Sequence, residues 1–135
     1  MNTTLHAARF TAAYWCVLIA ALLPVLCAVL AKRGSFRRAD NGNPRAWLER
    51  QTGWRARANA AQANSFESLP FFIGAVVIAH QLAAPQTGLD MLALGYVLLR
   101  VAYIAMYVGD MATARSIVWT AGLLVNIAIL FVGYR

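Results

Sequence analysis

The polar residues best suited to chemistry in this chain are Asn64 and Glu67, which lie where a basic segment passes into an apolar one. Residues three apart in a helix share one face. A carboxylate carried into a bilayer is costly, and it normally faces the interior of a helix bundle with a partner. The sequence therefore predicts a polar partner for Glu67 on a second helix.

A stripe on a later apolar segment offers that partner. Arg100, Tyr103 and Tyr107 have the i, i+3, i+7 spacing that places them on one helix face. An arginine at this depth is costly when isolated, and Glu67 is the only acidic residue at a comparable depth. We therefore predict a Glu67–Arg100 ion pair. Three structural alternatives stay open: the pair only joins two helices, Asn64 is an ordinary interhelical hydrogen bond, and Tyr107 belongs to an interfacial aromatic belt.

Arg115 begins the last apolar segment, where the positive end of the helix dipole disfavours a cation. Its guanidinium and the free N–H groups of the helix start would together form an anion site, suited to a thiolate or a carboxylate. Ser116 adds a hydroxyl donor beside it. The alternative interpretation is that Arg115 contacts lipid headgroups.

Four apolar segments must position these residues. Of the 135 residues, 61% are hydrophobic and 13% are charged, whereas a soluble domain carries about 25% charged residues. We predict one all-α integral membrane domain over residues 1–135, a bundle of four transmembrane helices. Their expected ranges are about 10–31, 55–83, 89–108 and 114–134. Four spans place both termini on one side and gather the polar residues at the other end.

Eight of the twelve basic residues lie between the first two apolar segments, in or directly after the loop over residues 32–54: Lys32, Arg33, Arg37, Arg38, Arg45, Arg50, Arg55 and Arg57. This distribution is typical of a cytoplasmic loop, so we expect the N- and C-termini on the non-cytoplasmic side. Anionic membrane lipids are the nearest acidic partners for such a loop. No motif accompanies the charge, so we expect no nucleic-acid partner. The cysteines and histidines lack metal-ligand spacing, so no metal site is expected.

Three short motifs follow one another along the chain: Asn64-x-x-Glu67-x-x-Pro70-x-Phe72, Arg100-Val101-Ala102-Tyr103-x-x-x-Tyr107 and Arg115-Ser116. In a four-span chain of this length the combination resembles the MAPEG family, the membrane-associated proteins in eicosanoid and glutathione metabolism. The resemblance covers essentially the whole chain. It implies a homotrimer with glutathione bound between protomers at the cytoplasmic side. The phrase Asp40-Asn41-Gly42-Asn43-Pro44-Arg45 is similar to bacterial members, which implies the inner (plasma) membrane.

The resemblance also implies roles for individual residues. Arg115 would hold the glutathione sulfur as a thiolate, because a neighbouring cation lowers the pKa of a thiol. Several members carry an arginine where this chain has Ala60, and Arg57, one turn earlier, is the candidate replacement. The implied glutathione-binding residues are Arg33, Arg57, Asn64, Glu67, Arg100, Tyr103 and Tyr107, with Arg115 and Ser116 at the reacting sulfur.

Three functions are compatible with these patterns. The first is a glutathione-dependent transferase or peroxidase, whose thiolate attacks a lipophilic electrophile or reduces a hydroperoxide. The second is a lipid-binding or scaffold member of the same family that catalyses nothing. The third is a small proton-coupled exporter, because four helices with one membrane glutamate resemble the small multidrug transporters. Those proteins carry their essential glutamate in the first helix, where this chain has none.

Overall fold

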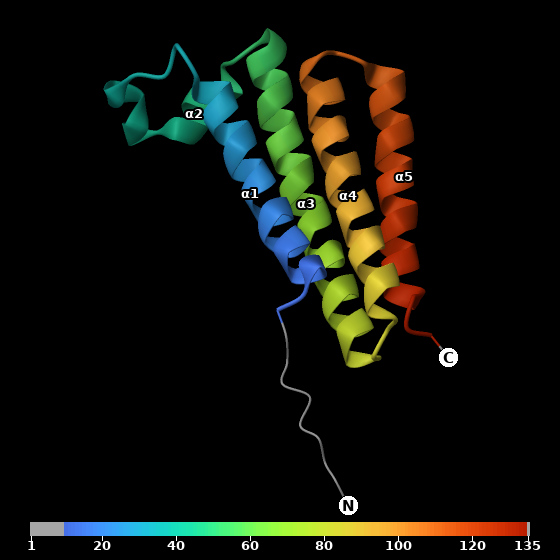
Figure 1. Cartoon of the computed structure of the whole chain (residues 1–135). Coiled ribbons are helices and arrows are strands. Elements are labelled where there is room, and N and C mark those ends of the chain that lie inside the picture. Colours follow the sequence, from blue (N-terminus) through green and yellow to red (C-terminus); the bar gives the residue numbers. More distant parts are fainter. Residues whose placement is uncertain (1–9, 135) are drawn as a thin grey trace, which may run out of the picture.

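A computed structural model describes residues 10–134, and this range contains helices and no strand (Figure 1). The all-helical prediction is thereby confirmed. Four long helices lie side by side, and a segment with two short helices projects from one end. In chain order the elements are α1 (Ala12–Lys32), the 3-10 helix η1 (Arg38–Gly42), α2 (Pro44–Glu49), α3 (Gly53–Gln81), α4 (Gln86–Val108) and α5 (Ala112–Phe131). The predicted domain extends into residues 1–9 and 135, which lie outside the described range.

The connections between the long helices are tighter than the sequence predicts. The third helix was expected to begin at about residue 89, but α4 begins at Gln86, directly after Pro85. Proline has a fixed φ suited to a helix start, so the chain enters the helix as soon as it leaves that residue. The expected loop over residues 32–54 also differs from the prediction, because it contains the short helices η1 and α2. Pro44 opens α2, and the side chain of Asn43 caps it by accepting from the Ala46 N–H at 3.2 Å.

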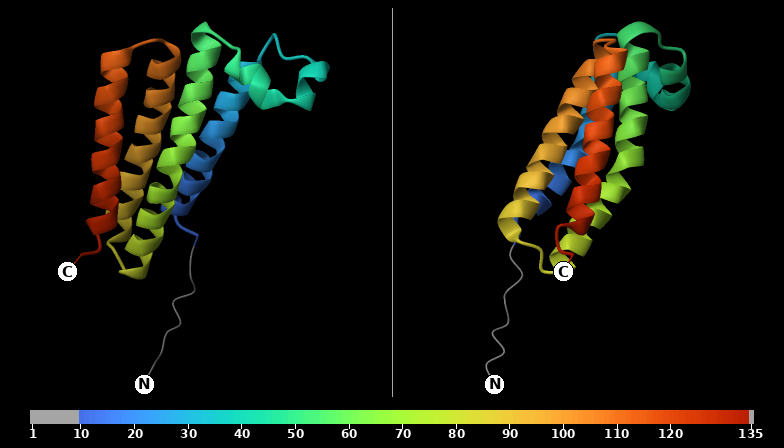
Figure 2. Two further views of the ribbon diagram at one scale, coloured as in Figure 1. Left: turned by 180° about the vertical axis from the view of Figure 1, so that it is seen from behind. Right: turned by 90° about the vertical axis from the view of Figure 1, so that its right-hand side faces the viewer.

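The arrangement brings the two ends of the described chain to the same end of the bundle. Figures 1 and 2 show α1 starting and α5 finishing there, while the projecting segment and the α4–α5 turn lie at the opposite end. Helices α3 and α4 each pack against the other three long helices. Helices α3 and α4, which carry most of the motif residues, are therefore in direct contact with each other.

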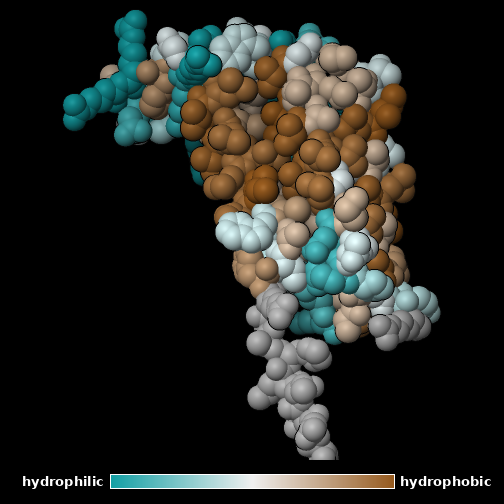
Figure 3. Space-filling view, in the orientation of Figure 1, coloured by the Kyte–Doolittle hydropathy of each residue, from teal (hydrophilic) through white to brown (hydrophobic). Residues whose placement is uncertain are grey.

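Three of the helices, α1, α4 and α5, are long and apolar enough to cross a membrane. Helix α3 has 29 residues, or about 43 Å, and its first half carries the basic and amide residues that lower its hydropathy. Large apolar side chains cover much of the bundle exterior, including Leu18, Val25, Leu98, Ile117 and Leu124. Figure 3 shows this apolar surface between a hydrophilic projecting segment and a hydrophilic patch near the opposite end. Such an exterior is stable in lipid rather than in water.

The end of the bundle where α1 begins and α5 finishes is joined by polar contacts. The carboxylate of Asp90 accepts hydrogen bonds from the Ala13 N–H at 2.9 Å and from Gln86 Nε2 at 2.8 Å. Thr11 Oγ1 lies 2.9 Å from His80 Nε2, and the His80 ring stacks on Tyr14 at 4.2 Å. Asp90 therefore caps the start of α1 from α4, and it fixes the two helices relative to each other.

Candidate functional site

Arg100 is the buried centre of the polar residues. Only 4% of it is exposed, yet it is a full charge on a helix that is otherwise apolar around it. Its Nη2 donates to Asn64 Oδ1 and to Ser65 Oγ, both at 3.1 Å. Ser65 in turn donates to the Ala61 carbonyl at 2.8 Å. The guanidinium of α4 is thus held by neutral acceptors on α3.

The predicted Glu67–Arg100 ion pair is wrong. The Glu67 side chain is exposed, and its carboxylate accepts a long hydrogen bond of 3.5 Å from Asn64 Nδ2. Within residues 10–134, Arg100 forms no ion pair. The reason is helix rotation: Glu67 lies about 160° around α3 from Ser65, so it turns aside when Ser65 faces α4. Spacing placed Glu67 near Asn64, but it did not say which of them faces Arg100.

The tyrosines and the two arginines form a continuous stack on α4 and α5. The Arg100 guanidinium lies 4.3 Å from the Tyr103 ring centre. Tyr103 meets Tyr107 edge to face at 5.6 Å, and Arg115 lies over Tyr107 at 4.1 Å. Each contact of a guanidinium with a ring face is favourable, because the ring face carries partial negative charge. The stack connects the buried arginine to the start of α5.

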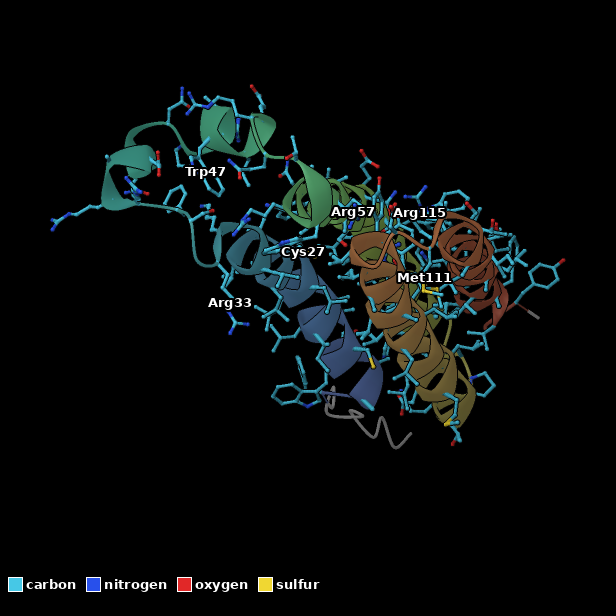
Figure 4. The ribbon with its side chains drawn as sticks, turned by 90° about the horizontal axis from the view of Figure 1, so that it is seen from above. Cys27, Arg33, Trp47, Arg57, Met111 and Arg115 are labelled. Carbon is cyan, nitrogen blue, oxygen red and sulfur yellow. The ribbon has the colours of Figure 1, made fainter. Side chains whose placement is uncertain are left out.

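Arg57 joins α3 to the turn that follows α4. Its Nε donates to the Val108 carbonyl at 2.9 Å, and its Nη1 lies 3.7 Å from the Asp110 carboxylate. Seen from above, Arg57 and Arg115 both lie at this end of the bundle (Figure 4). Arg57 therefore holds the end of α4, the helix that carries the tyrosine stack.

Two predicted site residues lie elsewhere in the single chain. Arg33 ends α1, is exposed, and projects outward from the bundle, away from Arg57 and Arg115 (Figure 4). Its carbonyl accepts from Arg55 Nη2 at 3.1 Å. Ser116 is also exposed, and its hydroxyl donates to the Ala112 carbonyl at 3.1 Å. Neither side chain meets the Arg100 stack, so their roles in ligand binding stay predictions.

A cavity of about 200 Å³ opens beside Arg100, between α3, α4 and α5. It combines apolar and aromatic walls with a few polar groups, the usual composition of a small-molecule site. Its walls are formed by Asn64, Glu67, Ser68, Phe71, Tyr96, Arg100, Trp119, Gly122, Leu123 and Asn126.

Sequence reasoning missed the α5 wall of this cavity. Arg115, Trp119, Gly122 and Asn126 follow the i, i+4, i+7, i+11 spacing of one helix face. The available signal was Asn126, a lone amide within an apolar helix, because polar side chains inside a membrane segment usually face the bundle. Ser65 was missed as well, since a serine in a helix gives no sign of its partner.

The electrostatics of the cavity favour an anion near Arg100. Glu67 is the only acidic residue in its walls, and it is exposed and not paired with Arg100. A buried charge without a counter-charge is destabilising, and neutral acceptors offset that cost only in part. An anionic group entering beside Arg100 would therefore be bound favourably.

Comparison with known proteins gives one match. The model of the MAPEG family matches residues 12–134, which include all four long helices and every motif described above. No curated protein and no solved structure matches the chain.

Proposed function

Because the chain belongs to the MAPEG family, as its motifs predicted, we propose that this membrane protein is a glutathione-dependent transferase or peroxidase acting on lipophilic electrophiles. Family membership supports a membrane protein related to glutathione and eicosanoid metabolism. The observation that carries the more specific proposal is Arg100, a buried cation with neutral partners at the wall of a cavity. Glutathione supplies carboxylates that would complete this site.

The charges of the site complement those of glutathione. Its carboxylates suit Arg100 and Arg57, and its ammonium suits the exposed carboxylate of Glu67. Asn64 connects the proposed carboxylate-binding and ammonium-binding side chains, because its Oδ1 accepts from Arg100 while its Nδ2 donates to Glu67. Tyr103 and Tyr107 add ring faces and hydroxyls along the same side.

Arg115 is the proposed catalytic residue. Its position in the first turns of α5 places a cation close to free backbone N–H groups, so a thiol bound there would have a lowered pKa. In the transferase reaction the thiolate sulfur bonds to an electrophilic carbon, which loses a leaving group in a substitution; in an addition, the neighbouring atom that receives the displaced electron pair takes up a proton. In the peroxidase reaction the sulfur takes one peroxide oxygen to form a sulfenic acid and an alcohol leaves, after which a second glutathione thiol converts the sulfenic acid to a disulfide with release of water. Ser116 is the proposed hydroxyl donor for this sulfur.

The proposed topology has α3 as a fourth span. The basic segment would then face the cytoplasm of a bacterial cell, with both termini on the other side of the inner membrane. A homotrimer would bring Arg33 of one protomer to the glutathione of its neighbour. The outward projection of Arg33 from its own bundle supports this assembly, because its side chain forms no hydrogen bond or ion pair within residues 10–134.

The competing proposal is a non-catalytic lipid-binding or scaffold protein. One observation favours it: the Ser116 hydroxyl is already bonded to the Ala112 carbonyl within α5. In that case glutathione binds, if at all, without ionisation of its thiol.

The deciding experiment is an ultraviolet difference spectrum of the purified protein on adding glutathione. We expect a thiolate band that Arg115→Ala abolishes and that Arg38→Ala, an exposed arginine on η1, retains. Calorimetry on the same samples reports binding separately. Binding without the band supports the scaffold proposal, and absence of binding removes glutathione from the function of this chain.

A further inference from the structure

Asn126 is a buried amide that the glutathione proposal does not use. It is 3% exposed, it lies on α5 in the wall of the cavity, and its side chain forms no hydrogen bond to any residue in 10–134. The Oδ1 atom is fully buried and unpartnered. A polar group in this state is destabilising, so its presence calls for a partner that residues 10–134 do not supply.

The surroundings of Asn126 define what that partner must be. Tyr96, Gly122 and Leu123 make this part of the cavity largely apolar, while Arg100 and Glu67 lie in the same wall toward the start of α5. No charged residue follows Asn126 on the described part of α5, so a charged ligand group would be uncompensated there. An uncharged group is required.

A hydroxyl meets the requirement best. It can both donate and accept a hydrogen bond, so it can pair with the amide of Asn126 whichever of Oδ1 and Nδ2 faces the cavity. Gly122 leaves room for it, since even a Cβ at that position would lie 4.0 Å from Tyr96.

The helix geometry gives the length of the molecule. Asn126 is eleven residues beyond Arg115 on the same face of α5, a separation of about 16 Å. Trp119 lies between them and is partly exposed at the cavity wall. An apolar chain running from Asn126 past Trp119 would end near Arg115.

We propose that the cavity between α3, α4 and α5 binds an amphipathic molecule whose hydroxyl is held by Asn126 and whose apolar chain extends along Trp119 toward Arg115. This proposal deepens the proposed function. It rests on that function only for the identification of the ligand as the electrophilic substrate. Binding of the hydroxylated chain itself does not depend on glutathione. Asn126 is then a specificity-determining residue that selects hydroxylated over plain hydrocarbon chains.

The test is a binding measurement without glutathione, using a long-chain primary alcohol with bromine about 10 Å from its hydroxyl, which is the separation of Asn126 and Trp119 along α5. Bromine quenches tryptophan fluorescence on contact. The matching bromoalkane without the hydroxyl is the reference ligand. Trp119→Phe gives the quenching that comes from the other tryptophans, and this is subtracted.

We expect the bromoalcohol to bind about fivefold more tightly than the bromoalkane, the difference that one net hydrogen bond provides. Asn126→Leu, of similar volume, should abolish the difference, and so should Asn126→Ala. The control Leu124→Ala, on the exposed side of the same helix, should keep it. Gly122→Leu should fill the cavity and reduce binding of both ligands.

Two results would overturn the proposal. One is equal binding of the two ligands by the unmodified protein, which would mean that Asn126 is satisfied by water alone. The other is a preference for the alcohol that survives Asn126→Leu, which would place the hydroxyl elsewhere. Because these measurements contain no glutathione, they stay informative if the ultraviolet experiment fails, and a failure here leaves the glutathione proposal standing.

Discussion

The guanidinium of Arg115 lies 4.1 Å from the centre of the Tyr107 ring, across the short turn that joins α4 to α5. This contact continues inward through Tyr103 to Arg100. A side chain with many rotamers is thereby held in one direction by a rigid ring. The proposed thiolate-stabilising group is thus positioned by α4 rather than by its own helix.

Tyr107→Leu should lower the proposed activity by about two- to thirtyfold, because the contact of a cation with a ring contributes about 0.5 to 2 kcal/mol to positioning Arg115. Tyr107→Phe keeps the ring and should behave almost like the unmodified protein. The measurement is the thiolate band together with kcat, compared with glutathione affinity from calorimetry. A loss of equal size in both variants would show that the hydroxyl of Tyr107 acts rather than its ring.

Asn64→Leu should destabilise the protein more than Asn64→Leu combined with Arg100→Leu. The single change removes one of the two acceptors of a buried guanidinium and should cost about 1 to 3 kcal/mol. The double change removes the charge as well. Unfolding in mixed micelles measures the complete double-mutant cycle. Additive effects of the two substitutions would show that the 3.1 Å contact contributes nothing to stability.

Glu67→Gln should leave the stability unchanged and weaken glutathione binding. The carboxylate is exposed and has no ion pair with Arg100, so its charge is not needed for the fold. Thermal unfolding and calorimetry on one preparation separate the two effects. A marked fall in thermal stability would indicate an ion pair that forms in the membrane after all.

Asp90→Ala should destabilise the bundle by about 1 kcal/mol, because the Ala13 N–H at the start of α1 would lose its acceptor. Asp110→Asn is the matched control. Asp110 is a surface carboxylate with a weak 3.7 Å pair to Arg57, and asparagine tolerates its positive φ of 63°. Equal effects of the two substitutions on the thermal midpoint would contradict the capping role of Asp90.

The sequence by itself determined which residues share a helix face, since that depends only on the 3.6-residue repeat. The spacing of Arg100, Tyr103 and Tyr107 predicted their common stripe, and the combined motifs identified the family, which the match over residues 12–134 confirms. Composition and hydropathy likewise indicated apolar helices of membrane-spanning length.

Only the tertiary structure decided how those faces are turned toward one another. The predicted Arg100–Glu67 ion pair and the observed contacts of Arg100 with Asn64 and Ser65 differ by a rotation of α3 through part of a turn. No local sequence pattern encodes that rotation. The unpartnered amide of Asn126 is a result of the same kind. Whether a buried polar group finds a partner depends on the packing of neighbouring helices, which is a property of the assembled bundle and not of any one segment.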